Sequence, residues 1–159
     1  MIDVDGYRLN VGIILCNSNN ELLWARRIGQ NAWQFPQGGI RKNESYEDAL
    51  FRELYEEIGL SENDISIIGA TSDWLYYQLP KELIRYGTKP LCIGQKQRWF
   101  LLQLESGEEN INLESSSRPE FDDWRWVDFW HPLNEVVEFK RDVYHAALSS
   151  FEKIIFGDP

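Results

Sequence analysis

The chain has 159 residues, 43% of them hydrophobic, and a formal net charge of −10. This size and apolar content predict one domain over residues 1–159, large enough to bury most of its unfolded surface. The chain contains no apolar run as long as a membrane span and no N-terminal signal peptide, and its two cysteines are too few for a disulfide framework. We therefore expect a cytoplasmic protein that does not contact membranes.

The first part of the chain alternates between strand-like runs and turns. Residues 6–16 and 21–26 are predicted to be strands joined by the polar turn at 17–20. Residues 33–35 are predicted to form a short strand that leads into a loop at 36–39. A hairpin followed by a glycine-containing loop is therefore expected before the first helix.

Residues 45–58 contain neither Pro nor Gly and are followed by Gly59, so a helix that ends at this glycine is predicted there. At about 100° per residue, Glu53, Glu56 and Glu57 share one narrow arc of its surface. Carboxylates gathered in the last turns of a helix repel each other and oppose the helix dipole. A charged surface is the simpler explanation for most acidic helices. The fixed spacing behind a glycine loop instead favours a site for a hard divalent cation.

The second half of the chain is predicted to contain more strands and a terminal helix. Strands are expected at residues 66–79, 91–104 and 124–129, and one or two helical turns at 133–138. Residues 141–156 are predicted to form the last helix. Its expected core residues are Val143, Ala147, Phe151, Ile154 and Ile155. Strands and helices interleaved in this way predict an α/β fold with a mixed sheet between helices.

Residues 38–60 resemble the Nudix box, the signature of the Nudix hydrolases. Gly38, Glu44 and the run Arg52-Glu53-Leu54-Tyr55-Glu56-Glu57-Ile58-Gly59-Leu60 fill every position of that signature. The resemblance implies an α/β/α sandwich with a mixed central β-sheet. It also implies a Mg²⁺-dependent or Mn²⁺-dependent hydrolase of phosphoanhydride bonds.

The segments around the box narrow the resemblance to the bacterial RNA pyrophosphohydrolase group. These segments are residues 6–12, 33–40, 93–100, 119–122 and 139–144. The resemblance implies an enzyme that converts 5′-triphosphate or diphosphate RNA ends to 5′-monophosphates and thereby promotes RNA decay. Diadenosine polyphosphate hydrolases are similar in the same loop, so dinucleoside polyphosphates are an alternative substrate. A non-catalytic nucleotide sensor is a second alternative, which the intact set of carboxylates disfavours.

The resemblance also implies roles for individual residues. The metal ligands are expected to be Gly38, Glu53, Glu56, Glu57 and Glu120. The catalytic residues are expected to be Glu53, Glu57 and Glu120, with either Glu53 or Glu120 as the general base. Glu44 and Arg52 are expected to support the loop and the acids rather than contact the substrate. The expected substrate-binding residues are Arg8, Arg27, Gln37 and Gln95 for phosphates and Tyr77, Val137, Phe139 and Lys140 for a base.

The overall negative charge argues against binding along nucleic acid, because Lys and Arg usually bind the phosphate backbone. The charged residues are unevenly distributed, however, which weakens this argument: residues 76–103 hold five basic residues and one acidic residue. The simpler alternative is a basic loop that only solvates the domain. We expect the RNA to be held mainly at its phosphorylated 5′ end, with modest affinity for the rest of the molecule.

Overall fold

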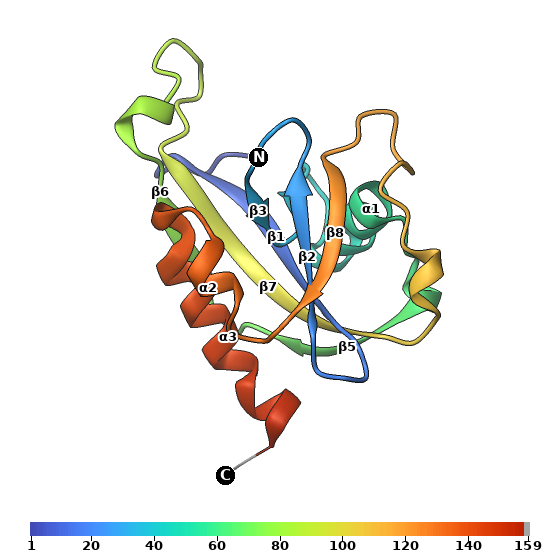
Figure 1. The fold of residues 1–159 in the computed structure, drawn as a ribbon. Helices are drawn as coiled ribbons and strands as arrows, with labels where there is room; N and C mark the ends of the chain where they lie inside the picture. Colours follow the sequence, from blue (N-terminus) through green and yellow to red (C-terminus); the bar gives the residue numbers. More distant parts are fainter. Residues whose placement is uncertain (158–159) are drawn as a thin grey trace.

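A computed structural model describes residues 1–157 as one mixed sheet of eight strands with helices on both faces (Figure 1). Residues 158 and 159, the last two of the predicted domain, lie outside the described residues. The α/β fold with a mixed sheet is therefore confirmed. The strands are β1 (Tyr7–Cys16), β2 (Leu22–Arg27), β3 (Trp33–Gln34), β4 (Gln37–Gly39), β5 (Ile65–Ala70), β6 (Leu75–Gln78), β7 (Gly94–Leu104) and β8 (Phe121–Val127), and the helices are α1 (Tyr46–Ile58), α2 (Pro132–Glu135) and α3 (Arg141–Phe156).

Strands β1 and β7 form the centre of the sheet as a parallel pair, in register from Tyr7 opposite Gly94 to Cys16 opposite Gln103. Alternate residues of β1 enter two separate cores. Val11, Ile13 and Leu15 pack in the core that contains α1, while Ile14 and Cys16 pack in the core that contains α3. Because both faces of the sheet are covered, this part of β1 is a continuous apolar run rather than an alternating one.

Helix α1 has the ends that its sequence predicts. Ser45 is the N-cap, and its side chain accepts a hydrogen bond from the Asp48 backbone N–H. Gly59 has a φ of 75° and donates its N–H to the Tyr55 carbonyl, so the helix stops in a left-handed residue that glycine adopts without strain. Leu50 and Leu54 are buried against the sheet. The predicted helix is confirmed, and its acidic arc faces β4.

Two strand predictions are wrong. Residues 66–79 form two strands, β5 and β6, which are separated at residues 71–74, and Thr71 still bonds to Trp99 of β7 through its backbone N–H and its hydroxyl. Residues 37–39 of the predicted loop form β4, which pairs antiparallel with β1 from Asn10 to Gly12. This pairing places the glycine loop beside the centre of the sheet.

Smaller corrections concern the ends of elements and one core residue. β7 begins at Gly94, three residues later than predicted, and β8 begins at Phe121, three residues earlier. Ile154 of α3 is 47% exposed and does not belong to the core, whereas Ile155 is partly buried against it. Within residues 1–157, no helix has the length and apolar character needed to cross a membrane.

Candidate active site

The loops that follow β2 and β6 and the loop that precedes β8 gather at one end of the sheet, at the top of Figure 1. A cavity of about 580 Å³ lies at this end. It includes nine of the residues predicted for catalysis, metal binding or substrate binding, brought together from four strands, α1 and the loop before β8. These residues are Arg8, Arg27, Gln37, Gly38, Glu53, Glu56, Glu57, Gln95 and Glu120.

The carboxylates of α1 are crowded and partly removed from water. Glu53 and Glu57 are 8% and 5% exposed, whereas Glu56 is partly exposed and Glu120 is exposed on its loop. Burial raises the pKa of Glu57 well above its ordinary range, and the nearby Glu53 raises it further. Burial also raises the pKa of Glu53. The folded protein therefore holds negative charge here at an energetic cost that a bound cation would remove.

Backbone groups of β4 lie directly against these carboxylates. The Gln37 N–H donates a 3.1 Å hydrogen bond to Glu57 Oε2. A Cβ atom added to Gly38 would overlap the carboxyl group of Glu53, so a larger residue at this position would displace that carboxylate or the backbone of β4. Carboxylate oxygens close to an open backbone form an all-oxygen donor set, which suits a hard divalent cation.

Arg52 binds several acids of this site at once. Its guanidinium donates to Glu44 Oε1 and Oε2 at 2.8 Å each and to Glu53 Oε1 at 2.7 Å. It also donates to the Gly39 carbonyl at 2.7 Å. Within residues 1–157, no three Asp, Glu, His or Cys side chains are grouped so that they could hold a metal ion. Arg52 donates hydrogen bonds to oxygens of both Glu53 and Glu56.

Glu44 supports the loop that carries the site. Besides Arg52, it accepts a 2.9 Å hydrogen bond from the Arg41 backbone N–H. The hydrogen bonds from Arg52 lower the pKa of Glu44 to about 2. The ionised Glu44 therefore joins the loop before α1 to the acidic face of the helix.

We expect Glu44→Gln to lower the free energy of unfolding by about 2 kcal/mol at pH 7, because it removes charged hydrogen bonds to Arg52. A pKa that is lower in the folded state means that this stability is present above pH 4.5 and is lost as the pH falls toward 2. Urea unfolding at several pH values measures the effect. The control Glu47→Gln alters an exposed acid of the same helix and should change little. A deficit that persists unchanged near pH 2 would contradict this role of the Glu44 charge.

Four amide side chains at the cavity are joined in a row by hydrogen bonds. Gln97 donates to Asn10 at 2.8 Å and to Gln37 at 3.1 Å, and Gln37 donates to Gln95 at 3.4 Å. Asn10 and Gln97 are buried, and sequence reasoning missed both. The strand sequences contain no clear signal, because Arg8 in β1 and Gln95, Lys96 and Arg98 in β7 are also polar. The row fixes the position of Gln37, whose backbone holds Glu57.

Four arginines line the cavity: Arg8, Arg27, Arg41 and Arg118. The first two were predicted, whereas Arg41 and Arg118 were missed. Arg41 lies between Gly38 and Glu44 in the box, and Arg118 directly precedes the Pro119-Glu120 pair, so both lay within or beside recognisable motifs. Guanidinium groups are well suited to bind phosphate oxygens, so these four residues are candidates for contacts to a phosphorylated ligand.

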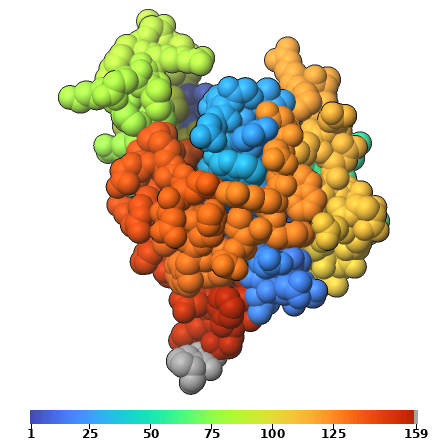
Figure 2. Space-filling view, in the orientation of Figure 1, coloured from blue at the N-terminus to red at the C-terminus, as the bar shows by residue number. Residues whose placement is uncertain are grey.

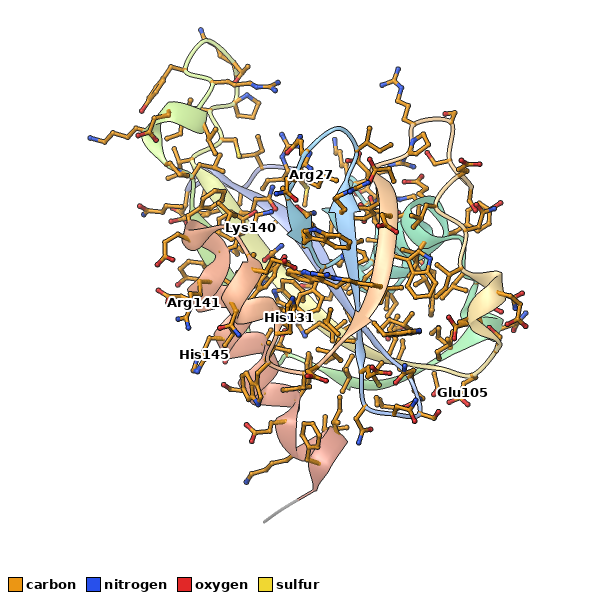
Figure 3. The ribbon with its side chains drawn as sticks, in the orientation of Figure 1. Arg27, Glu105, His131, Lys140, Arg141 and His145 are labelled. Atoms are coloured by element: carbon orange, nitrogen blue, oxygen red, sulfur yellow. The ribbon has the colours of Figure 1, made fainter. Side chains whose placement is uncertain are left out.

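The residues predicted to hold a base gather only in part. Tyr77 and Phe139 are in ring contact at 5.5 Å, and the Lys140 ammonium lies 5.9 Å from the Tyr77 ring. Val137 is half-exposed and, with Lys140, lines a separate cavity of about 240 Å³. Figure 3 shows Arg27 and Lys140 toward the same end of the molecule. Burial, followed by the charge of Arg27, lowers the pKa of Lys140 to about 8.

Comparison with known proteins identifies the family. A family model described as "NUDIX domain" matches residues 6–147. The RNA pyrophosphohydrolase of Pasteurella multocida (strain Pm70) is 61% identical over 156 residues, which are 98% of this chain and 79% of that protein. The RNA pyrophosphohydrolase of Escherichia coli O139:H28 (strain E24377A / ETEC) is 58% identical over 157 residues, 99% of this chain and 89% of that protein.

Solved structures agree on the fold. The E. coli dihydroneopterin triphosphate pyrophosphohydrolase has a TM-score of 0.69 at 16% identity, covering 96% of this chain and 99% of that one. A binary complex of the C. elegans Ap4A hydrolase also has a TM-score of 0.69 at 16% identity, covering 95% and 99%. Nudix hydrolases use divalent metal ions. The family match over most of the chain and the high identity to curated relatives show that this chain belongs to the Nudix hydrolase family.

Proposed function

We propose that this protein is an RNA 5′ pyrophosphohydrolase that converts 5′-triphosphate or diphosphate RNA ends to 5′-monophosphates and so promotes RNA decay. The observation that carries the proposal is 58–61% identity, over 98–99% of the chain, to proteins named RNA pyrophosphohydrolase. The cavity adds a chemical reason, because it combines buried carboxylates with four arginines. We further propose that residues 1–159 act as a single Nudix domain in the cytoplasm.

In this proposal Glu53, Glu56, Glu57 and Glu120, with the Gly38 carbonyl, hold Mg²⁺ or Mn²⁺. When bound, the metal neutralises phosphate charge and lowers the pKa of water. The protein itself supplies the positioning. The Gln37 N–H fixes the carboxylate of Glu57, and Arg52 fixes that of Glu53.

The remaining proposed roles are binding of the substrate and transfer of a proton. Arg8, Arg27, Gln37 and Gln95 bind the phosphate oxygens, which places the anhydride bond over the acids. Either Glu53 or Glu120 accepts the proton of the attacking water. Tyr77, Val137, Phe139 and Lys140 bind a base near the 5′ end.

A direct comparison of substrates tests this proposal. With Mg²⁺ present, we expect release of pyrophosphate or phosphate from 5′-triphosphorylated RNA at a much higher kcat/KM than hydrolysis of diadenosine tetraphosphate. Excess EDTA should stop both reactions. A higher kcat/KM on the dinucleotide would establish the diadenosine polyphosphate alternative. Tight binding of both substrates with no turnover would instead indicate a nucleotide sensor.

A further inference from the structure

A second cavity, of about 570 Å³, adjoins the active-site cavity. Arg8, Arg27 and Gln95 line both, so the two cavities meet at these three residues. The outer wall of the second cavity is the loop between β6 and β7. In Figure 2 this loop stands apart from the β2–β3 segment, with a hollow between them. The other lining residues are Ile2, Leu79, Leu83, Arg85, Thr88, Lys89, Pro90 and Cys92.

The charge of the second cavity is opposite to that of the protein. Its lining includes four cations, Arg8, Arg27, Arg85 and Lys89, and no acid, whereas the whole chain has a net charge of −10. In the part of the chain that the structure describes, none of these four has a carboxylate partner within 4.0 Å, while Arg26, Arg52, Lys96 and Arg125 each have one. Unpaired like charges around one hollow favour an anionic ligand.

The shape of the combined space selects a chain-like anion. A compact anion such as a free phosphate would occupy one cavity, whereas an extended ligand that contacts Arg8 and Arg27 can enter both. Leu79, Leu83 and Pro90 add an apolar surface on which a ribose or a base can pack. An RNA strand offers phosphates, sugars and bases in this repeating order.

We infer that the second cavity binds the phosphate backbone of the RNA nucleotides that follow the 5′ end, with Arg85 and Lys89 as phosphate contacts. The inference rests on the proposed function, because it needs an RNA whose 5′ phosphates occupy the first cavity. Contacts to backbone phosphates position a strand without selecting its sequence. The second cavity therefore adds affinity for RNA that extends beyond the first nucleotides.

The test compares a 5′-triphosphorylated dinucleotide with a 5′-triphosphorylated octanucleotide of the same first two residues. We expect the double variant Arg85→Ala/Lys89→Ala to raise KM for the octanucleotide about fourfold, a factor of about two for each exposed charge, at unchanged kcat. KM for the dinucleotide should not change. The log–log salt dependence of octanucleotide binding should become shallower by about 1.4, or about 0.7 for each lost contact.

A charge-matched control separates a local contact from the general field of the protein. The double variant Lys42→Ala/Lys81→Ala removes the same charge from two exposed residues outside both cavities, and Lys81 belongs to the same loop. Its KM values should equal those of the wild type. Equal effects of the two double variants on the octanucleotide would overturn the inference, as would an equal effect of Arg85→Ala/Lys89→Ala on both RNAs. Failure of the wild type to release pyrophosphate from either RNA would instead remove the proposed function, and this inference with it.

The alkylation rate of Cys92 provides an independent measure of whether RNA occupies the second cavity. It lines the second cavity and is partly exposed, whereas Cys16 is 1% exposed and serves as an internal reference. With Ca²⁺ in place of Mg²⁺ to slow turnover, the octanucleotide should slow alkylation of Cys92 severalfold, and the dinucleotide should not. Equal protection by the two RNAs, or protection by neither, would contradict binding in this cavity.

Discussion

Glu57→Gln is expected to lower kcat for 5′-triphosphorylated RNA by about a thousandfold, equivalent to about 4 kcal/mol of transition-state stabilisation. Glutamine keeps the size of the side chain but removes the charge, and its neutral amide oxygen binds a hard cation more weakly than a carboxylate does. Glu57 is the most buried acid of the cavity, and the Gln37 N–H fixes one of its oxygens. Rapid-quench or steady-state measurement of pyrophosphate release gives kcat.

The same variant has a readout that does not depend on turnover. Mg²⁺ should raise the Tm of the wild-type protein, because a ligand that binds only the folded state stabilises it, and this increase should largely disappear in Glu57→Gln. Glu47→Gln, in the first turn of the same helix, should keep both the activity and the Mg²⁺-dependent increase in Tm. Full activity of Glu57→Gln would rule out Glu57 as a metal ligand.

The raised pKa of Glu57 also predicts how Glu57→Gln behaves without metal. A carboxyl group whose pKa is higher in the folded state takes up more protons there, so its contribution to stability falls as the pH rises above 4.5 and through the raised value. In EDTA at pH 8, Glu57→Gln should therefore be at least as stable as the wild type toward urea. The same substitution is thus expected to lower kcat strongly and, in the absence of metal, to remove the energetic cost of a buried negative charge.

Gly38→Ala is expected to reduce kcat by at least about a hundredfold, because small displacements of catalytic groups have effects of this size. The added methyl group would overlap the Glu53 carboxyl group. Either the carboxylate or β4 must move, and in both cases Glu53 leaves its position beside the backbone. Steady-state kinetics measures the loss, and circular dichroism checks that the sheet and helices still form.

Gly39→Ala is the matched control, because it adds the same methyl group one residue later. There the nearest atoms are the Leu9 carbonyl oxygen at 3.9 Å and Arg8 Cδ at 4.0 Å, which are ordinary contacts. Neither glycine has a positive φ, so backbone strain does not distinguish the two variants. Gly39→Ala should retain activity within about threefold. Similar losses in both variants would show that the overlap with Glu53 is not the cause.

Local sequence signals predict those parts of the fold that depend on nearby residues. Ser45 and Gly59 act within α1 itself, so both ends of this helix could be predicted. The break that follows β5 could not be predicted, because Thr71 there bonds to Trp99, 28 residues further along the chain. The pairing of β4 with β1 was missed for the same reason, since no short-range pattern predicts a three-residue strand.

The candidate site likewise contains some residues that could be predicted from the local sequence and others that could not. The box residues could be predicted because the chemistry requires their spacing, although their roles here remain predictions. Asn10 and Gln97 enter the site through a tertiary contact that no spacing rule describes. Arg41 was missed although it lies inside the box. Val137 was expected to share a base-binding pocket with Tyr77 and Phe139, but it lines a cavity that the two aromatic residues do not line.

The central pair of strands also constrains how the protein is made. Every residue pair along β1 and β7 is 87 positions apart, as for Tyr7 and Gly94 (94 − 7 = 87). During synthesis, β1 therefore leaves the ribosome well before its main partner is translated, with its apolar run uncovered. Contacts of such long range form slowly, and exposed strand edges favour aggregation. We expect the nascent chain to depend on chaperones until residue 104 has emerged, after which the sheet closes cooperatively.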